Sequence, residues 1–267
     1  MGKNKLKKFA DMKDWAHVYE YAQSLYALED CELKGHWHER VFGNDRPIVL
    51  ELGCGKGEYA VGLASRCPDR NFIGIDIKGA RMWTGAGQAL EKGLSNVVFL
   101  RTHIEFLTHF FAPGEVAEIW LTFPDPQMKK VRKRLTSTRF MKDYASILQA
   151  GGCIHLKTDS RFMFEYTEAM IAANGLEVQF RTDDLYHDGL PEGEVSSRRF
   201  EEQAGVPNLQ TFYEKQWLQR GLSIKYVRFL VPQGKEWVEP EVEIEPDDYR
   251  SFGRQARWLD DDVIPEP

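Results

Sequence analysis

Short runs of strand-forming residues recur along this chain, and most are separated by segments long enough to form a helix. Alternation of this kind predicts an α/β fold, in which a seven-stranded, mostly parallel sheet carries helices on both faces. The last two runs lack a crossover of the usual length, which favours an antiparallel strand at that end of the sheet. The seven runs are Ile48–Leu52, Asn71–Asp76, Val97–Leu100, Ile119–Phe123, Cys153–Lys157, Leu176–Arg181 and Ser223–Val231.

The segments between these runs place apolar residues at helical spacing. One expected helix covers Thr136–Ala150, with Thr136 or Ser137 as its N-cap and Gly151-Gly152 as its end. Tyr19–Leu28, near the N-terminus, has the same spacing and is also expected to be helical. Further helices are expected near Tyr59–Ala64, Ala80–Lys92, Ile104–Phe111, Arg161–Asn174 and Phe212–Arg220.

The segment Glu118–Arg139 combines a strand, a stiff turn and a basic strip. Two prolines bracket one acid in Pro124-Asp125-Pro126, and the residue before a proline is normally extended. Phe123 and Asp125 are therefore both expected to be extended, with the acid held at the carboxyl end of a strand. The basic strip that follows suggests a polyanionic partner, although such a run can also be an ordinary solvated surface. It consists of Lys129, Lys130, Arg132, Lys133, Arg134 and Arg139.

The formal net charge of −6 is concentrated near the C-terminus. Residues 236–267 contain eleven acidic and three basic side chains, so the rest of the chain is close to neutral. Three parts are therefore expected: a basic N-terminal extension (1–45), an α/β domain (46–232) and an acidic tail (233–267). An acidic total does not exclude RNA binding when the acids are confined to a tail.

No apolar run approaches the roughly 20 residues of a membrane helix, and the basic N-terminus lacks the apolar core of a secretory signal. The four cysteines are widely spaced and form no C-x-x-C pair. Reduced thiols in a cytoplasmic protein without a membrane anchor are the simplest interpretation.

A glycine-rich loop follows the first strand and reads E-x-G-x-G-x-G, from Glu51 through Gly53 and Gly55 to Gly57. Asp76 ends the next strand, where an acid can accept hydrogen bonds from ribose hydroxyls. A nicotinamide dinucleotide site usually has G-x-G-x-x-G, and acids beside the loop would repel a pyrophosphate. A cofactor with a cationic end, such as S-adenosylmethionine, fits better; a glycine turn that binds nothing is the structural alternative.

The loop resembles motif I of class I S-adenosylmethionine-dependent methyltransferases. F-P-D-P-x-x-K-K at Phe123–Lys130 is more specific and resembles the bacterial tRNA (guanine-N7)-methyltransferases. T-D at Thr158-Asp159, T-x-x-E at Thr211–Glu214 and G-x-x-I at Gly221–Ile224 strengthen the resemblance, which runs from about Ile48 to Leu230. It implies a Rossmann-like fold, S-adenosylmethionine as cofactor, tRNA as partner, and methyl transfer to N7 of a variable-loop guanine. No metal is expected, and no obligate protein partner is evident from the sequence.

The resemblance also implies residue roles. Asp125 is the expected catalytic residue and also a cofactor contact, although an aromatic often found after P-D-P is replaced here by Gln127-Met128. The other expected cofactor contacts are Glu51, Gly53, Gly55, Gly57, Asp76 and His103, where the family commonly has Asp at the last position. The expected substrate contacts are Lys129, Arg134, Asp159, Thr211 and Glu214, although T-x-x-E is also a helix capping box.

Two other classes of function remain open at this stage. A class I methyltransferase with a protein or small-molecule substrate would not need the basic strip. A non-catalytic RNA-binding module would be expected to have a damaged cofactor loop, and this loop is intact. A nicotinamide-dependent oxidoreductase is disfavoured by the glycine spacing.

Overall fold

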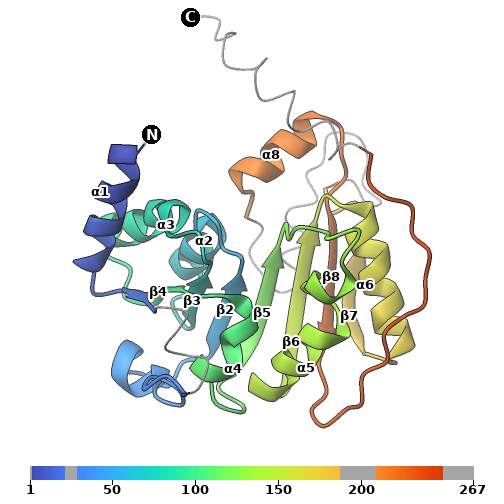
Figure 1. The fold of residues 1–267 in the computed structure, drawn as a ribbon, viewed down its shortest axis with the longest axis horizontal. Coiled ribbons are helices and arrows are strands. Elements are labelled where there is room, and N and C mark those ends of the chain that lie inside the picture. The colour runs from blue at the N-terminus through green and yellow to red at the C-terminus, as the bar shows by residue number, and fades with distance from the viewer. Residues whose placement is uncertain (1, 22–28, 187–208, 249–267) are drawn as a thin grey trace, which may run out of the picture.

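The computed structural model describes residues 2–21, 29–186 and 209–248. Within these residues, eight strands form one sheet in the order β1-β4-β3-β2-β5-β6-β8-β7 (Figure 1). The first six strands in this order run parallel to one another. β8 is antiparallel to both β6 and β7, so the antiparallel strand expected at this end is confirmed.

All seven predicted strands are present, with ends shifted by a few residues. Their bounds are β2 Ile48–Leu52, β3 Asn71–Ile75, β4 Val97–Arg101, β5 Val116–Thr122, β6 Leu148–Thr158, β7 Val178–Thr182 and β8 Lys225–Leu230. β2 and β3 are buried along their whole length, as expected for strands covered on both faces.

The eighth strand, β1 (Val18–Glu20), comes from the N-terminal extension and pairs with β4. The helix expected over Tyr19–Leu28 is therefore wrong at its start, because Tyr19 pairs with Leu100 as an edge strand. Residues 22–28 of that prediction lie outside the described part of the chain. Short segments can have helical spacing by chance, and pairing with an open sheet edge overrides that weak preference.

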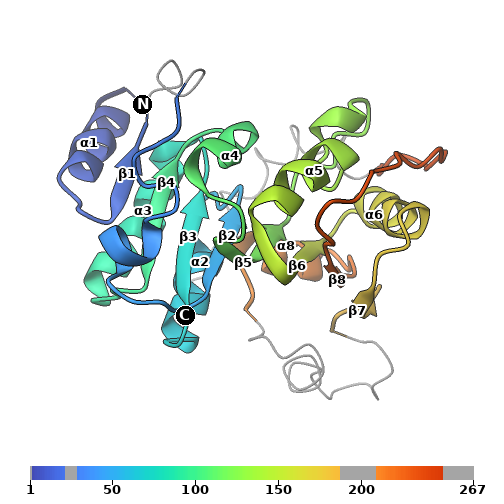
Figure 2. The same ribbon diagram turned by 90° about the horizontal axis from the view of Figure 1, so that it is seen from below.

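Helices cover both faces of the sheet, as predicted (Figures 1 and 2). In the described ranges the α helices are α1 Gly2–Lys13, α2 Glu58–Arg66, α3 Gly79–Glu91, α4 Leu107–Phe110, α5 Thr138–Ile147, α6 Arg161–Ala173 and α8 Phe212–Gln219. Short helical turns of other types are η2 Trp37–Phe42, η3 Ile104–Phe106 and η4 Val131–Lys133.

The connection from α5 to β6 differs from the prediction. Ser137 is the N-cap of α5, as one of the two expected caps, but the helix ends at Ile147. Gly151 and Gly152 lie inside β6 rather than ending a helix, and Gly151 has a φ of 78°. The strand begins at Leu148 because that residue pairs with Val116, and an irregularity then restores the register with β5.

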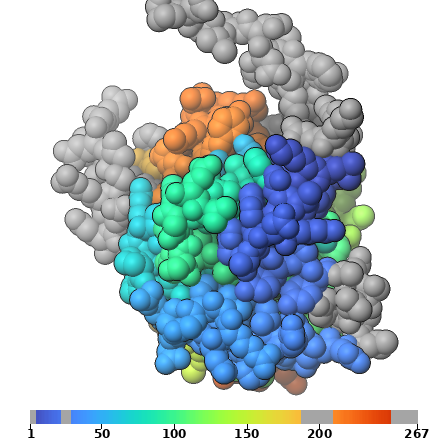
Figure 3. All heavy atoms as spheres, turned by 90° about the vertical axis from the view of Figure 1, so that its left-hand side faces the viewer, coloured from blue at the N-terminus to red at the C-terminus, as the bar shows by residue number. Residues whose placement is uncertain are grey.

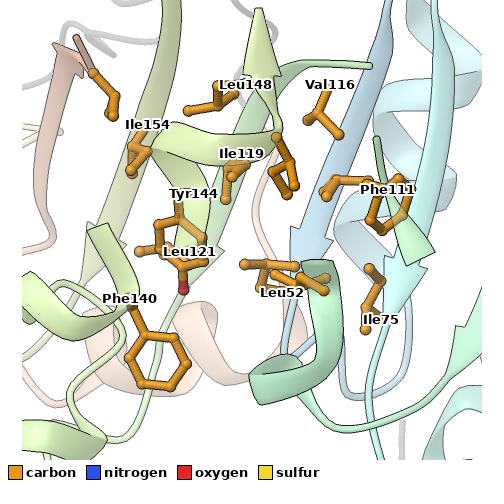
Figure 4. Close-up of a cluster of buried hydrophobic side chains, with 14 of the residues drawn as sticks. Leu52, Ile75, Phe111, Val116, Ile119, Leu121, Phe140, Tyr144, Leu148 and Ile154 are labelled. Atoms are coloured by element: carbon orange, nitrogen blue, oxygen red, sulfur yellow. The ribbon is translucent and has the colours of Figure 1, made fainter. Parts of the chain in front are cut away.

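Two hydrophobic clusters lie on opposite faces of the sheet. The larger one packs α4, α5 and α6 against β2, β5 and β6. Figure 4 shows Leu52, Ile119 and Leu121 of the strands close to Phe140 and Tyr144 of α5. The second cluster packs α2 and α3 on the other face, around Tyr59, Phe99 and Trp120.

Helix α1 packs on α3 at the edge of the molecule (Figure 3). Asp11 accepts a hydrogen bond from the Trp83 indole at 3.0 Å, and Lys8 lies 4.7 Å from the centre of that ring system. The N-terminal extension is thus tied to the helix that follows the Asp76 strand. No helix in the described part of the chain is long and apolar enough to cross a membrane.

The glycine loop packs against α3 so closely that α3 needs a glycine there. A Cβ on Gly85 would lie 2.5 Å from the Lys56 carbonyl oxygen, whereas one on Gly87 would meet only Trp15 at 3.5 Å. We expect Gly85→Ala to lower the free energy of unfolding by about 1–3 kcal/mol through overpacking. Gly87→Ala, the matched control, should raise it by about 0.5–1 kcal/mol through helix propensity. Urea unfolding measures both, and equal effects would contradict this packing.

Candidate active site

A cavity of about 560 Å³ opens where the parallel strands β2, β3, β5 and β6 end. Ligands of open α/β sheets bind at this edge, because the loops after the strands meet there. One side is formed by the glycine loop and Asp76, the other by Pro124, Asp125 and Asp159. Residues of α8 complete the wall, and Figure 1 shows this helix above the strand ends.

The glycine loop and Asp76 form one hydrogen-bonded unit. Asp76 accepts hydrogen bonds from the amide of Gly55 at 2.9 Å and from the amide of Lys78 at 2.8 Å. The amides of Gly53 and Cys54 donate to the carbonyl of Ile75 at 2.8 and 3.0 Å. Gly53 and Gly55 have φ values of 76° and 55°, which favour glycine. These hydrogen bonds hold the glycine loop next to the Asp76 carboxylate.

Glu51 is a buried acid, only 4% exposed, at the base of the cavity. Its carboxylate accepts hydrogen bonds from the Thr122 hydroxyl at 2.7 Å and the Ala60 amide at 2.9 Å. Burial raises the pKa of this carboxyl to about 7, although both hydrogen bonds favour the ionised form. A cationic ligand in the cavity would draw Glu51 into the charged state.

Asp125 is exposed and lines the cavity. Its carboxylate accepts a hydrogen bond from the Gln127 amide at 3.0 Å, which forms a tight turn. The expectation that Phe123 is extended is wrong, because its φ is 51°. The Phe123 amide donates to the Lys157 carbonyl at 2.8 Å. This hydrogen bond to β6 thus stabilises the strained backbone conformation of Phe123, and such strain is common at functional sites.

Asp159 follows β6 and lies in the wall of the same cavity, although its residue is only 2% exposed. The Thr158 hydroxyl accepts a hydrogen bond from the Ser160 amide at 3.0 Å, which fixes the turn into α6. The T-D motif is therefore a rigid junction between β6 and α6 that presents one acid to the cavity.

Helix α8 is anchored by a buried ion pair. Lys157 of β6 lies 2.6 Å from Glu214, and both side chains are 0% exposed. The Lys157 ammonium also donates to the Leu209 carbonyl at 2.8 Å and to the Tyr186 hydroxyl at 3.2 Å. Burial lowers the pKa of Lys157, whereas the Glu214 carboxylate opposes that shift. Sequence reasoning missed Lys157, because nothing in its pattern distinguishes it from a solvent-facing lysine.

The T-x-x-E motif forms a capping box at the start of α8. Thr211 accepts from the Glu214 amide at 3.2 Å, and Glu214 accepts from the Thr211 amide at 3.1 Å. Thr211 lines the cavity, but Glu214 points into the interior and does not line it. The structure thus separates two residues that the resemblance treats alike.

Three other expected contacts lie outside the cavity lining. Gly57 is buried behind the loop, where a Cβ would lie 2.6 Å from the Phe99 ring. His103 precedes η3 and meets the Phe106 ring edge-on. Lys129 is exposed on the loop after Pro126, outside the cavity lining.

Arg134, the remaining expected substrate contact, is turned inward. Its guanidinium donates to the Met128 carbonyl at 3.0 Å and stacks over Tyr166 at 4.3 Å and Phe162 at 4.7 Å. The residue is only 6% exposed. The other bases of the strip between residues 129 and 133 are exposed, so Arg134 holds the loop that displays them.

The cavity contains residues that the sequence did not single out. Thr122, Tyr213 and Trp217 line it, together with Lys56 and Arg81. The two aromatics come from α8, and an aromatic pair at helical spacing normally indicates core packing. Only the placement of α8 over the strand ends shows that they face a cavity.

Glu118 of β5 and Cys153 and His155 of β6 offer ligand atoms that lie within 4.8 Å of one another. They already have partners: Arg70 pairs with Glu118, and the Tyr226 hydroxyl lies 2.7 Å from His155 Nδ1. His155 also stacks on Trp120 at 4.0 Å. This cluster is separate from the cavity, and the expectation that no metal is needed stays a prediction.

Comparison with known proteins identifies the family. A family model described as a putative methyltransferase matches residues 45–225. The tRNA (guanine-N(7)-)-methyltransferase of Bacteroides fragilis is 57% identical over 257 residues, covering 96% of this chain and 97% of that one. That of Porphyromonas gingivalis is 55% identical over 249 residues, covering 92% and 98%. This chain belongs to the tRNA (guanine-N(7)-)-methyltransferase family.

More distant proteins agree with this family and with the fold. The Bacillus subtilis tRNA (guanine-N(7)-)-methyltransferase is 37% identical to this chain over 186 residues. The match covers 68% of this chain and 86% of the Bacillus subtilis protein. Among solved structures, the 16S rRNA methyltransferase KamB has a TM-score of 0.54 at 17% identity, covering 76% of this chain and 95% of its own. The latter similarity shows the Rossmann-like methyltransferase fold and nothing more specific.

The raised pKa of Glu51 predicts a pH-dependent stability. Between its ordinary pKa of 4.5 and about 7, the unfolded carboxyl is ionised while the folded one keeps its proton. The free energy of unfolding therefore falls as pH rises through this window. Glu51→Gln should be more stable than wild type at pH 8 by on the order of 1–3 kcal/mol, and nearly equal at pH 4.5. Urea unfolding at both values, with Glu91→Gln as the exposed control, measures this; a pH-independent difference would contradict it.

The Lys157–Glu214 pair predicts a large cost for removing one partner. Lys157→Met leaves a buried carboxylate without its cation and should lower the free energy of unfolding by about 3–5 kcal/mol. The double variant Lys157→Met/Glu214→Gln, which removes both charges and keeps a capping side chain, should recover most of that loss. Urea unfolding measures the stability of both variants. If the double variant were no more stable than Lys157→Met, an unpaired buried charge would be ruled out as the cause of the loss.

Proposed function

We propose that the cavity carries out the family's reaction with S-adenosylmethionine as methyl donor and a variable-loop guanine of tRNA as acceptor. The observation that carries the proposal is that one cavity is lined both by the glycine loop with Asp76 and by Asp125 with Asp159. These residues come from four separate strand ends, and the family's motifs meet at one place. The chain acts in the cytoplasm, with its RNA substrate.

The cofactor half of the site is formed by Glu51, the glycine loop and Asp76. Asp76 is oriented by two backbone amides, and its remaining lone pairs can accept hydrogen bonds from both ribose hydroxyls. Glu51 supplies negative charge at the base of the cavity and favours the cationic amino acid end of the cofactor. Gly53 and Gly55 let the cofactor approach the backbone closely.

The reaction is an in-line displacement that needs position more than a base. N7 of guanine carries a lone pair and no proton, so it attacks the methyl carbon directly. The N7–carbon bond forms as the carbon–sulfur bond breaks, and the sulfur takes the bonding electron pair to give neutral S-adenosylhomocysteine. Positive charge moves to the purine, and the Asp125 carboxylate stabilises it there.

Asp159 and Thr211 form the guanine-binding half. A carboxylate can accept from guanine N1–H and the N2 amino group, which distinguishes guanine from adenine. Asp159 has this role in our proposal, because it lines the cavity, whereas Glu214 pairs with Lys157 in the interior and does not line it. The aromatic rings of Tyr213 and Trp217 face the same cavity and provide surfaces for stacking a base that has left its own stack.

The exposed bases after Asp125 hold the RNA backbone. Lys129, Lys130, Arg132 and Lys133 are exposed around η4, next to the turn that carries the acid. Phosphate contacts of this kind make binding dependent on salt and insensitive to sequence. Arg134 contributes indirectly by holding the carbonyls of the same loop.

Methyl transfer from labelled S-adenosylmethionine to unmodified tRNA tests the proposal. With EDTA present, the wild type should label one variable-loop guanine, located by cleavage of the RNA at 7-methylguanine. Asp125→Asn should lower kcat by at least about tenfold, because a neutral amide stabilises the cationic purine less. Asp69→Asn, which changes an exposed acid in a turn away from the cavity, should have no effect.

The outcomes separate the parts of the proposal. Label at another nucleotide would exclude the variable loop. Loss of activity with EDTA, under conditions in which the tRNA keeps its fold, would exclude a metal-free reaction. An unchanged kcat in Asp125→Asn would remove the catalytic role of this residue.

A further inference from the structure

Residues 232–248, here called the strap, leave β8 and run along α5 and α6 toward the cavity edge of the sheet (Figures 1 and 2). Residues 233–248 of the strap belong to the expected acidic tail (233–267), and the proposed chemistry does not use the strap. The strap has no helix or strand, yet side chains of the body hold it at several places.

The first attachment is at the end of α6. The side-chain amide of Asn174 donates to the Val238 carbonyl at 2.8 Å, and its oxygen accepts from the Val238 amide at 2.8 Å. Asn174 is only 3% exposed. This paired contact fixes the strap's path before it reaches the site.

The second attachment is Glu239, which connects the strap to the loop after Asp125. Its carboxylate accepts from the Thr138 amide at 3.2 Å and hydroxyl at 2.6 Å, at the start of α5. The same carboxylate accepts from the Tyr166 hydroxyl. Tyr166 stacks under Arg134, which in turn holds the Met128 carbonyl. A continuous chain of contacts therefore runs from the strap to the loop that displays the exposed bases.

The third attachment is Asp247 at the start of α6. Its carboxylate accepts from the Phe162 amide at 3.0 Å and from the Ser160 hydroxyl, and the residue is only 7% exposed. Ser160 accepts from the Met163 amide at 2.9 Å and follows Asp159 directly. Asp247 thus fixes the turn that carries the guanine-binding acid of our proposal. A negative charge there is also favoured by the helix dipole.

Residues 127–134, which carry the exposed bases after Asp125, are here called the basic loop. Between Glu239 and Asp247 the strap faces this loop across a small cavity of about 380 Å³. Met128 and Arg134 line it from the loop, and Val242, Glu243 and Ile244 line it from the strap. The strap therefore spans the substrate half of the site from the basic loop to the Asp159 turn. None of its described contacts reaches the glycine loop or Asp76.

We propose that the strap is a positioning element for the RNA side of the reaction, with Glu239 and Asp247 as its positioning residues. Glu239 acts through Tyr166 and Arg134 on the basic loop, and Asp247 acts through Ser160 on Asp159. The inference rests on the proposed function for its kinetic readout. The opposing hypothesis is that the strap's acids repel or displace RNA from the basic strip.

The test compares Asp247→Ala and Glu239→Ala with Glu241→Ala, which removes an exposed acid of the same strap. We expect kcat/KM for tRNA to fall by at least about tenfold in the first two, since small misplacements near a reacting centre are costly. The control should stay within about twofold, because a solvent-exposed side chain has little effect on the site. The affinity for S-adenosylhomocysteine, measured by calorimetry, should be unchanged in all three.

Asp247→Asn separates positioning from charge. An asparagine can still accept from the Phe162 amide through its side-chain oxygen, but it carries no charge. Positioning predicts that this variant recovers most of the lost kcat/KM. Repulsion of RNA by the strap predicts tighter tRNA binding in both Asp247 variants, and that result would overturn the proposal.

Hydrogen exchange provides a readout that does not need activity. In Asp247→Ala the amides of residues 158–164 should exchange faster, and in Glu239→Ala those of residues 127–134. Unchanged exchange together with unchanged kcat/KM would overturn the proposal. If the wild type fails to methylate tRNA, the proposed function fails, while the exchange data still test the strap. If Asp247→Ala does not fold, Glu239→Ala carries the test.

Discussion

The buried ion pair between Lys157 and Glu214 is the interaction on which the site depends. Both charges are removed from water, so the pair is favourable only when α8 lies closely against β6 and the remaining hydrogen bonds are made. The contacts of Lys157 with the Leu209 carbonyl and the Tyr186 hydroxyl meet that requirement. With α8 in this position, Tyr213 and Trp217 line the cavity, and the Lys56 ammonium of the glycine loop lies 6.0 Å from the centre of the Tyr213 ring. The motif T-x-x-E is therefore part of the scaffold that builds the cavity wall.

Two separately organised halves meet in this cavity. On the side of β2 and β3, backbone amides and Asp76 form a rigid unit suited to a nucleoside with a cationic end. On the side of β5 and β6, two acids line the cavity and exposed bases follow Asp125 in the chain. The strap holds this second half from outside, through Glu239 and Asp247. Methyl transfer needs a fixed distance between the two halves of the cavity. The parallel pairing of β2 with β5 sets that distance.

The sequence predicted what depends on local pattern. The strands, the glycine loop and the placement of Asp76, Asp125 and Asp159 at strand ends follow from periodicity and from the parallel topology. Roles that depend on side-chain direction were not predictable. Glu214 and Arg134 were expected to contact the substrate, yet both turn inward because buried partners are available. Edge strand β1 and the strap depend on contacts between distant residues, such as Val18 with Phe99 and Asp247 with Phe162. No local periodicity signals such contacts.

Two affinities measured on two variants show whether the cavity has a cofactor half and an RNA half. Asp76→Asn and Asp159→Asn change one acid in each half. Calorimetry with S-adenosylhomocysteine and filter binding with unmodified tRNA give the dissociation constants. Asp76→Asn should weaken only the binding of S-adenosylhomocysteine and Asp159→Asn only the binding of tRNA, each by at least about tenfold. If either substitution weakened both ligands equally, or if the two effects were reversed, the division of the cavity would be contradicted.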